Sequence, residues 1–177
     1  MTNKNKTDAC IHRLQGGFPH MQQHPMRLSK NEIADMIQIE KFLAGANVCH
    51  LGMSDKGQPY VVPMNYGYSD GQFYLHCAAA GRKLDILREN NLVCVEVTVD
   101  AHVISEGSPC SWSTAYTSVI GFGRAFLIEA AAEKEAALNK LMHSYTGSSQ
   151  HEFNAQSMNR VTVIRIEIDD IRAKQNI

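Results

Sequence analysis

Three short apolar runs near the middle of the chain, each joined to the next by a tight turn, constrain its fold most strongly. They cover residues 48–53, 59–68 and 72–77, with Asp55-Lys-Gly57 and Ser69-Asp-Gly71 between them. Glycine turns of this kind between apolar runs are a strong short-range signal for β-hairpins. The centre of the chain is therefore predicted to form consecutive antiparallel strands.

The flanking segments supply helices and longer strands. We predict helices over residues 29–43, 82–89 and 130–145, and further strands over residues 92–99, 115–129 and 160–169. Ser29-Lys-Asn-Glu32 is a capping box that would begin the first helix. Valine at alternate positions from Val93 to Val99, with Cys94, Glu96 and Thr98 between them, is typical of a half-buried strand. Residues 100–113 are predicted to be a longer loop.

Six strands, hairpin-linked early and joined by helices later, predict a mainly β fold with helices (α+β). The strands would form a small closed barrel, because Gly121 and Gly123 sit where a barrel strand has to bend. At 177 residues the chain is large enough for one domain with a real core. We assign residues 27–177 to this domain and residues 1–26, which are polar and broken by glycine and proline, to an N-terminal tail or strap.

Composition gives no support to several classes of partner. The net charge of −1 gives no general reason to expect nucleic acid or an anionic membrane, and no apolar run approaches membrane-spanning length. The five cysteines lie far apart, which indicates reduced thiols, and the N-terminus has no apolar signal segment, so we expect a cytoplasmic protein. Cys10, His12, His20 and His24 could ligate a metal on a helix, but the surrounding glycines and prolines disfavour one, and no metal site is predicted.

The segment from Ala78 to Lys83 has the features of a phosphate site. Three alanines and Gly81 lead into a predicted helix that opens with Arg82 and Lys83. The free N–H groups and the dipole of a helix N-terminus favour an anion, and arginine and lysine add charge. The alternative is a solvated helix face, which is what most adjacent basic pairs are.

Pro63 stands inside an otherwise strong strand, between Val62 and Met64. We predict that the strand stops making ladder bonds at this proline, which would leave backbone polar groups for a flat ligand. Asn65 carries both a donor and an acceptor and could bind a polar ring edge, whereas Met64 is more often a core residue. The alternative for Pro63 is a place on an edge strand.

Several motifs in one fixed order resemble the 5-nitroimidazole-resistance (Nim) proteins of the flavin-binding split-barrel superfamily of pyridoxamine-5′-phosphate oxidase. These motifs are A-x-V-C-x-L-x-M, P-Y-V-V-P-M-N-Y-G-Y, D-G-x-F-Y-L-H, G-R-K-L-D, N-x-x-V-C-x-E-V and Y-x-S-V-I-G-F-G-R-A. The likeness covers roughly residues 27–170. It implies a six-stranded split β-barrel of the FMN-binding type with peripheral helices, and a homodimer with two flavins, FMN or FAD, at the subunit interface.

The resemblance also implies site residues. The strand that matches Val61, Val62, Pro63, Met64 and Asn65 would run along the isoalloxazine edge. The residues implied for the other flavin contacts are Gly81, Arg82 and Lys83 at the phosphate, Trp112, Tyr116 and Ser118 approaching from the partner subunit, and His76 close to the flavin. Trp112 would suit stacking on a flat ring, and the alternative for Trp112, Tyr116 and Ser118 is that they are ordinary strand residues. His76 could donate a proton to a reduced nitro oxygen, or could only support the phosphate loop.

The implied activity is that of a flavin-dependent oxidoreductase that reduces small electron-poor substrates, with nitroimidazole going to the amine. One alternative is a pyridoxamine-phosphate-type oxidase that passes electrons to oxygen. Another is a flavin- or haem-binding protein without catalysis, because a fold does not determine a function.

Overall fold

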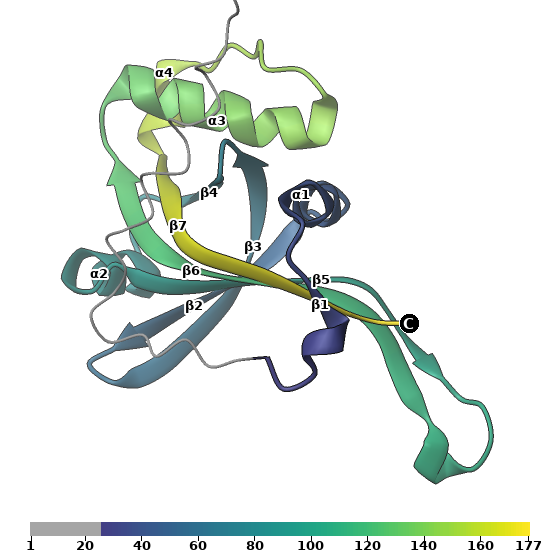
Figure 1. Ribbon diagram of the computed structural model, residues 1–177. Coiled ribbons are helices and arrows are strands. Elements are labelled where there is room, and N and C mark those ends of the chain that lie inside the picture. Colours follow the sequence, from purple (N-terminus) through teal and green to yellow (C-terminus); the bar gives the residue numbers. More distant parts are fainter. Residues whose placement is uncertain (1–25) are drawn as a thin grey trace, which may run out of the picture.

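The computed structural model describes residues 26–177, so the predicted tail lies outside the described residues except for Met26 (Figure 1). The strands are β1 (Glu32–Ile33), β2 (Val48–Asp55), β3 (Gln58–Ser69), β4 (Gln72–Ala78), β5 (Leu92–Ile104), β6 (Ser113–Ile128) and β7 (Val161–Asn176). The helices are α1 (Met36–Ala44), α2 (Arg82–Glu89), α3 (Ala131–Thr146) and α4 (Ala155–Asn159), with 3-10 turns η2 (Ser29–Asn31) and η3 (Pro109–Ser111). No helix among these residues combines the length and the apolar character needed to cross a membrane.

The strands form one antiparallel sheet that closes on itself. Their order is β1-β7-β4-β3-β2-β5-β6, and β6 also pairs with β7, so the strands from β2 to β7 make a ring. Closure removes the exposed edges that an open sheet would have, except where two neighbouring strands of the ring separate. The prediction of a mainly β barrel with helices outside it is confirmed, but the count of six strands omitted β1, which pairs with the end of β7.

The interior of the ring is filled by alternate residues of each strand. On β5 the side chains of Val93, Val95 and Val97 are buried, as the alternation predicts, and Ile164 and Ile166 of β7 are buried in the same core. Each fully buried aliphatic side chain of this size contributes about 1.5–3 kcal/mol of transfer free energy. The ring therefore carries the main core of the protein.

The longest helix, α3, covers a second, smaller core outside the ring (Figure 1). It packs Leu138 and Leu141 against Tyr74 of β4 and Val163 of β7. Gly67 of β3 lies directly beneath it, and a Cβ there would come 2.7 Å from the Cα of Leu141. The helix therefore approaches β3 closely, and Gly147 ends it in the left-handed conformation with φ of 71°, which glycine adopts without steric cost.

The first helix begins later than the capping box predicts. Ser29–Asn31 forms a 3-10 turn, Glu32 and Ile33 pair with Lys174 and Ala173 of β7, and α1 starts only at Met36. The side chain of Asp35 accepts a hydrogen bond from the backbone N–H of Ile37 at 3.0 Å and is the actual cap. The prediction was wrong because pairing with a distant strand outweighed a local helix signal.

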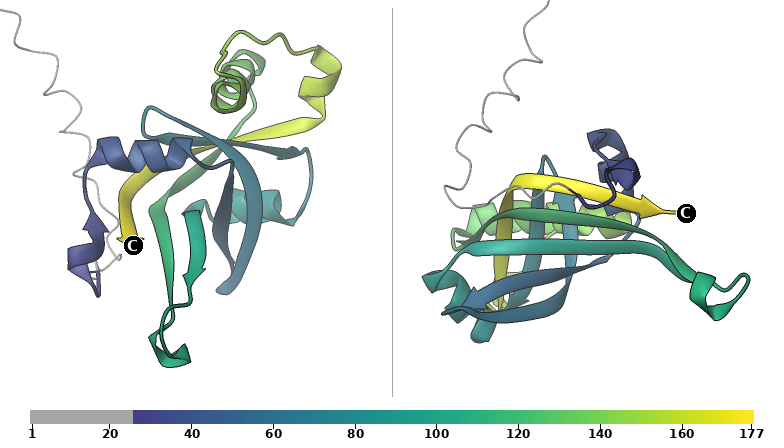
Figure 2. Two further views of the ribbon diagram at one scale, coloured as in Figure 1. Left: turned by 90° about the vertical axis from the view of Figure 1, so that its right-hand side faces the viewer. Right: turned by 60° about the horizontal axis from the view of Figure 1, so that its bottom comes forward.

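The predicted loop over residues 100–113 is a loop only from residue 105 to residue 112, including the 3-10 turn η3, because the strands of the β5–β6 hairpin occupy the rest. After a register shift between Val99 and His102, the two strands pair again from His102 to Ile104. We call residues 100–114 the arm, because this part of the hairpin projects away from the barrel (Figure 2). β7 also runs on to Asn176, well past the predicted end at residue 169, because it pairs with β6 throughout.

Candidate functional site

β3 and β4 separate part-way along their length, and this separation defines the candidate site. They pair only from Tyr66–Leu75 to Ser69–Gln72, after which β4 stays on β7 and leads into α2. Residues 58–65 of β3 pair with β2 on one side, and on the other side no strand of the described chain pairs with them. The backbone polar groups of such an edge are available to a ligand.

Pro63 does not interrupt β3, so that prediction was wrong. The strand runs unbroken from Gln58 to Ser69, and Pro63 lies opposite His50 of β2. A strand with one unpaired edge tolerates proline, because the missing N–H costs nothing where it has no partner strand. The free edge that the sequence suggested is present, but the divergence of β4 creates it.

The side chains of Val61–Asn65 alternate between the two faces of β3. Val61, Pro63 and Asn65 are exposed on the outer face, whereas Met64 is buried in the core and Val62 packs against it. The amide nitrogen of Asn65 donates a hydrogen bond to the backbone carbonyl of Asn47 at 3.1 Å. The side chains of Val61, Pro63 and Asn65 are therefore the ones that this strand presents on its outer face.

The start of α2 has the local structure of an anion site. Gly81 precedes the helix with φ of 142°, a conformation that favours glycine, and no side chain caps the helix. A Cβ at Gly81 would meet nothing within 4 Å, so the backbone here is open. The first N–H groups of a helix have no intrahelical acceptor, and α2 therefore presents donors to a ligand.

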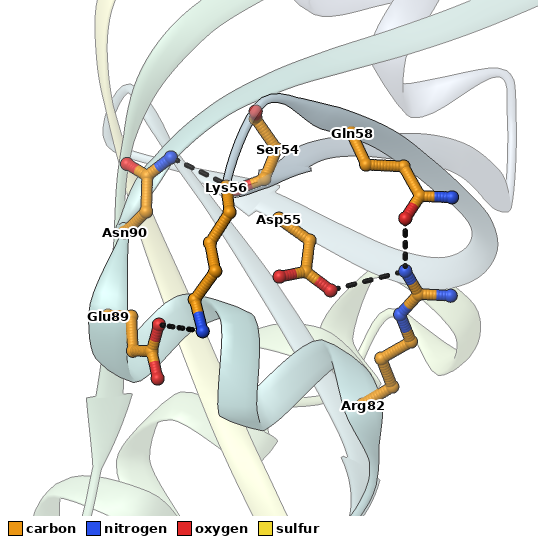
Figure 3. Close-up of polar contacts among 7 residues, drawn as sticks. All are labelled: Ser54, Asp55, Lys56, Gln58, Arg82, Glu89 and Asn90. Carbon is orange, nitrogen blue, oxygen red and sulfur yellow. Dashed lines mark hydrogen bonds and ion pairs between the residues drawn. The ribbon is translucent and has the colours of Figure 1, made fainter.

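The partly exposed side chain of Arg82 is held by hydrogen bonds to the β2–β3 hairpin (Figure 3). Its Nη2 donates to Oδ2 of Asp55 at 3.1 Å and to Oε1 of Gln58 at 3.4 Å. The guanidinium also lies 4.7 Å from the ring centroid of Tyr60, which is a cation–π distance. Both hydrogen bonds use Nη2. The N–H groups of Nη1 and Nε therefore have no hydrogen-bond acceptor among residues 26–177.

The other end of α2 is tied to the turn of the same hairpin (Figure 3). The side-chain amide of Asn90 donates to the carbonyl of Ser54 at 3.2 Å, and Lys56 lies 3.9 Å from the carboxylate of Glu89. Contacts at both ends hold the helix and the hairpin together. The position of Arg82 is therefore set by tertiary contacts.

This arrangement fits the phosphate group of a nucleotide cofactor. The ion pair of Arg82 with Asp55 is partly exposed, and such pairs contribute about 0–1 kcal/mol, so a phosphate can compete with the carboxylate. Lys83 is half-buried close to Cys77: burial raises the pKa of that thiol, and the positive charge of Lys83 opposes the shift. The two cations and the open helix start thus lie together beside the free edge of β3.

The remaining predicted residues lie on β4, on the arm and on β6. His76 is exposed at the end of β4, and neither ring nitrogen has a hydrogen-bond partner among residues 26–177. Trp112 is exposed on the arm, and Tyr116 and Ser118 are half-buried on the outer face of β6. In the sheet, β2 and β5 separate β6 from β3, which is about 14 Å at the usual strand spacing. One chain does not bring these three residues to Arg82.

Sequence reasoning missed a polar cluster on the outer face. His50 of β2 lies directly opposite Glu96 of β5, and its Nδ1 is 2.9 Å from Oε2 of that carboxylate. The hydroxyl of Thr98 donates to the other oxygen of Glu96. Alternation along residues 92–99 already placed Glu96 and Thr98 on the outer face. The pairing with His50 depends on the register of β2 and β5.

The match to a family model agrees with this geometry. Residues 35–175 match the model described as pyridoxamine 5'-phosphate oxidase, which is most of the chain. The chain belongs to the pyridoxamine 5'-phosphate oxidase family. This assignment confirms the superfamily to which the sequence motifs pointed.

Solved structures support the same assignment. A proposed 5-nitroimidazole antibiotic resistance protein from Bacteroides thetaiotaomicron is 32% identical, with a TM-score of 0.72, over 81% of this chain and 86% of that one. The flavocytochrome Anf3 from Azotobacter vinelandii (23% identity, TM-score 0.75, 87% of this chain and 73% of that one) shares the fold. So does an FAD- and haem-binding protein from Mycobacterium smegmatis (18% identity, TM-score 0.74, 82% and 73%). No curated protein sequence matches this family member.

Proposed function

We propose that the protein binds a flavin nucleotide, FMN or FAD, and uses it to reduce small electron-poor substrates, including nitroimidazoles. The observation that carries the proposal is the open start of α2 and the anchored Arg82 beside the unpaired edge of β3. The 32% identity to a proposed 5-nitroimidazole antibiotic resistance protein supports the choice of substrate.

Each part of the site has a separate task in this proposal. The N–H groups of α2, Arg82 and Lys83 bind the phosphate, and the Nη2 anchor to Asp55 and Gln58 keeps Arg82 in place before the ligand arrives. The backbone of Val61–Asn65 binds the polar edge of the ring. When bound, a flavin supplies the two-electron chemistry by which a reduced nicotinamide or another cellular donor can reduce a nitro group. His76, exposed at the end of β4, is a candidate proton donor.

A homodimer with flavin at its interface belongs to the same proposal. The outer face of the sheet and the arm expose large apolar side chains, among them Val61, Ile120 and Trp112. Exposed apolar surface of this kind is typical of interaction sites. A second copy packed here could bring its Trp112, Tyr116 and Ser118 to the flavin, which their own chain does not reach.

An absorbance spectrum of the purified protein, followed by heat release and chromatography of the bound species, tests the cofactor. We expect flavin bands and one released nucleotide, which distinguishes FMN from FAD.

Anaerobic turnover with reduced nicotinamide and a 5-nitroimidazole then tests the reaction, with the amine as the expected product. Peroxide formation with pyridoxamine phosphate would favour an oxidase, a Soret band would indicate haem, and bound flavin without turnover would indicate a binding protein. A colourless protein that refuses added flavin would contradict the proposal.

The double variant Arg82→Ala/Lys83→Ala tests the phosphate site. We expect flavin retention to fall at least about 100-fold while the protein stays folded, because two charge-assisted contacts of about 1.5–3 kcal/mol each are removed. The matched control is Lys41→Ala/Arg88→Ala, which removes two exposed cations, one from α1 and one from α2, away from Gly81. Stoichiometric flavin in the first variant, or equal loss in both, would contradict the assignment.

A further inference from the structure

The His50–Glu96 pair is a hydrogen-bonded pair of titratable residues on the outer face that the proposed function does not yet use. Glu96 accepts from both sides, from His50 at 2.9 Å and from the hydroxyl of Thr98. Because an ionised carboxylate only accepts, the hydrogen between the two residues belongs to Nδ1 of His50. The pair therefore holds the imidazole in one orientation and one tautomer.

The second ring nitrogen of His50 is open. The side chain is 52% exposed, and Nε2 makes no hydrogen bond within the part of the chain that the structure describes. Next to it on the outer face lie Val48 and Gly52 of β2 and Pro63 of β3, none of which is charged. The adjacent titratable residues are Glu96 and Cys94 of β5, and burial raises the pKa of the Cys94 thiol.

His50 is one strand away from the proposed flavin edge. It is the direct cross-strand partner of Pro63, in the middle of Val61–Asn65, and cross-strand partners lie on the same face about 5 Å apart. His76 lies on the other side of the separation between β3 and β4, but no hydrogen bond within residues 26–177 orients its ring. Of the two histidines beside the site, His50 is the one with a positioned imidazole.

We infer that His50 is the proton donor to the nitro group and that Glu96 is its positioning residue; this inference rests on the proposed function. In the first reduction step the nitro group takes up two electrons, which originate from a reduced nicotinamide. One nitro oxygen takes the Nε2 proton of the imidazolium, and a second proton from solvent completes the water that leaves as the N–O bond breaks. The product is the nitroso compound, and the neutral imidazole then takes up a new proton from solvent.

The test uses the flavin-loaded protein reduced with dithionite, so that it does not depend on the identity of the natural donor. Reoxidation by 2-methyl-5-nitroimidazole is followed by flavin absorbance between pH 5 and 8 in wild type and in the variants His50→Gln, Glu96→Gln, His76→Gln and His143→Gln. His143 is an exposed histidine on α3 and serves as the control. Nitrogen-15 NMR of the histidine rings reports the tautomer of His50 independently of activity.

We expect His50→Gln to retain stoichiometric flavin but to reoxidise about 100-fold more slowly, with the pH dependence lost, since general acids contribute about 10²–10⁴-fold. Glu96→Gln should lose the Nδ1–H tautomer signal of His50 and reoxidise at an intermediate rate. His143→Gln should behave as wild type.

Wild-type reoxidation in His50→Gln, a slow rate in His76→Gln alone, or an unchanged His50 tautomer in Glu96→Gln would overturn the inference and leave the proposed function standing. A wild-type protein that retains no flavin, or whose reduced flavin does not react with the nitro compound, would overturn both.

Discussion

The β5–β6 hairpin is built in two ways along its length. In the barrel, Val93, Val95 and Val97 point into the core, and β6 is paired with β5 on one side and β7 on the other. In the arm every residue except Ile104 is exposed, with Val103 at 64% and Trp112 at 52%. The two parts meet at the register shift between Val99 and His102.

This difference shows that two parts of one hairpin, paired in the same way, can contribute very different amounts to the free energy of unfolding. Valine occurs in both parts, so residue type does not decide whether the side chain is buried. A two-stranded ribbon on its own is marginally stable in water, and the barrel part gains its stability from ring closure and the core. The arm makes little use of its apolar side chains within one chain, which fits the proposed second copy.

The largest effect is expected in the barrel part at Gly123. A Cβ at this position would come 2.0 Å from the carbonyl oxygen of Glu167, so Gly123→Ala forces the backbone of β6 away from β7. We expect a loss of about 3 kcal/mol or more in the free energy of unfolding, or failure to fold. Urea unfolding followed by far-UV circular dichroism measures it. The control is Gly52→Ala, where the nearest atom lies 3.4 Å from the added Cβ; equal stability of the two variants would show that β6 and β7 are not this close.

A matched pair of substitutions on β5 compares the two parts directly. Val95→Ala removes two methyl groups from a side chain that is 1% exposed, and should cost about 2 kcal/mol. Val103→Ala makes the same chemical change in the arm and should stay within about 0.5 kcal/mol. Both values come from the same unfolding experiment. The experiment is run at a protein concentration where the monomer predominates, so that similar losses in the two variants would mean that Val103 is buried within its own chain.

The smallest effect on the folded chain is expected from Val103→Ser/Trp112→Ser. The double substitution should leave the fold of the barrel unchanged but raise the dissociation constant of the proposed dimer at least about tenfold, or about 1.4 kcal/mol. Sedimentation velocity over a concentration series measures it. Ile37→Ser on α1, also strongly exposed, serves as the control. Identical dissociation constants for the wild type and the double variant would exclude the arm from the interface.

Local signals predicted local structure well. Helix α2 runs from Arg82 to Glu89 as predicted, and the turns at Asp55-Lys-Gly57 and Ser69-Asp-Gly71 join strands as predicted. Lys56 and Asp70 have positive φ, as do the glycines that follow them. Turn and helix-end preferences act over a few residues, so they survive whatever the rest of the chain does.

Errors occurred where distant strands compete with local preferences. The capping box at Ser29–Glu32 was overridden by pairing of Glu32 and Ile33 with β7, about 140 residues later. The strand ends of the arm, residues 100–104 and 113, were predicted as loop because they pair only with each other and have no buried face to impose alternation.

The sequence by itself determined the class of the fold, the core face of the strands, the open helix start at Gly81 and the residues Arg82 and Lys83, because each depends on alternation or on neighbours in the chain. Only the tertiary structure decided that β6 closes the ring on β7, that β4 leaves β3 to create a free edge, and that Asp55 and Gln58 hold Arg82. It also decided that His50 meets Glu96 across 46 residues of sequence. Such contacts depend on strand register, which is set by the packing of the whole core and shifts every side chain when it slips by one residue.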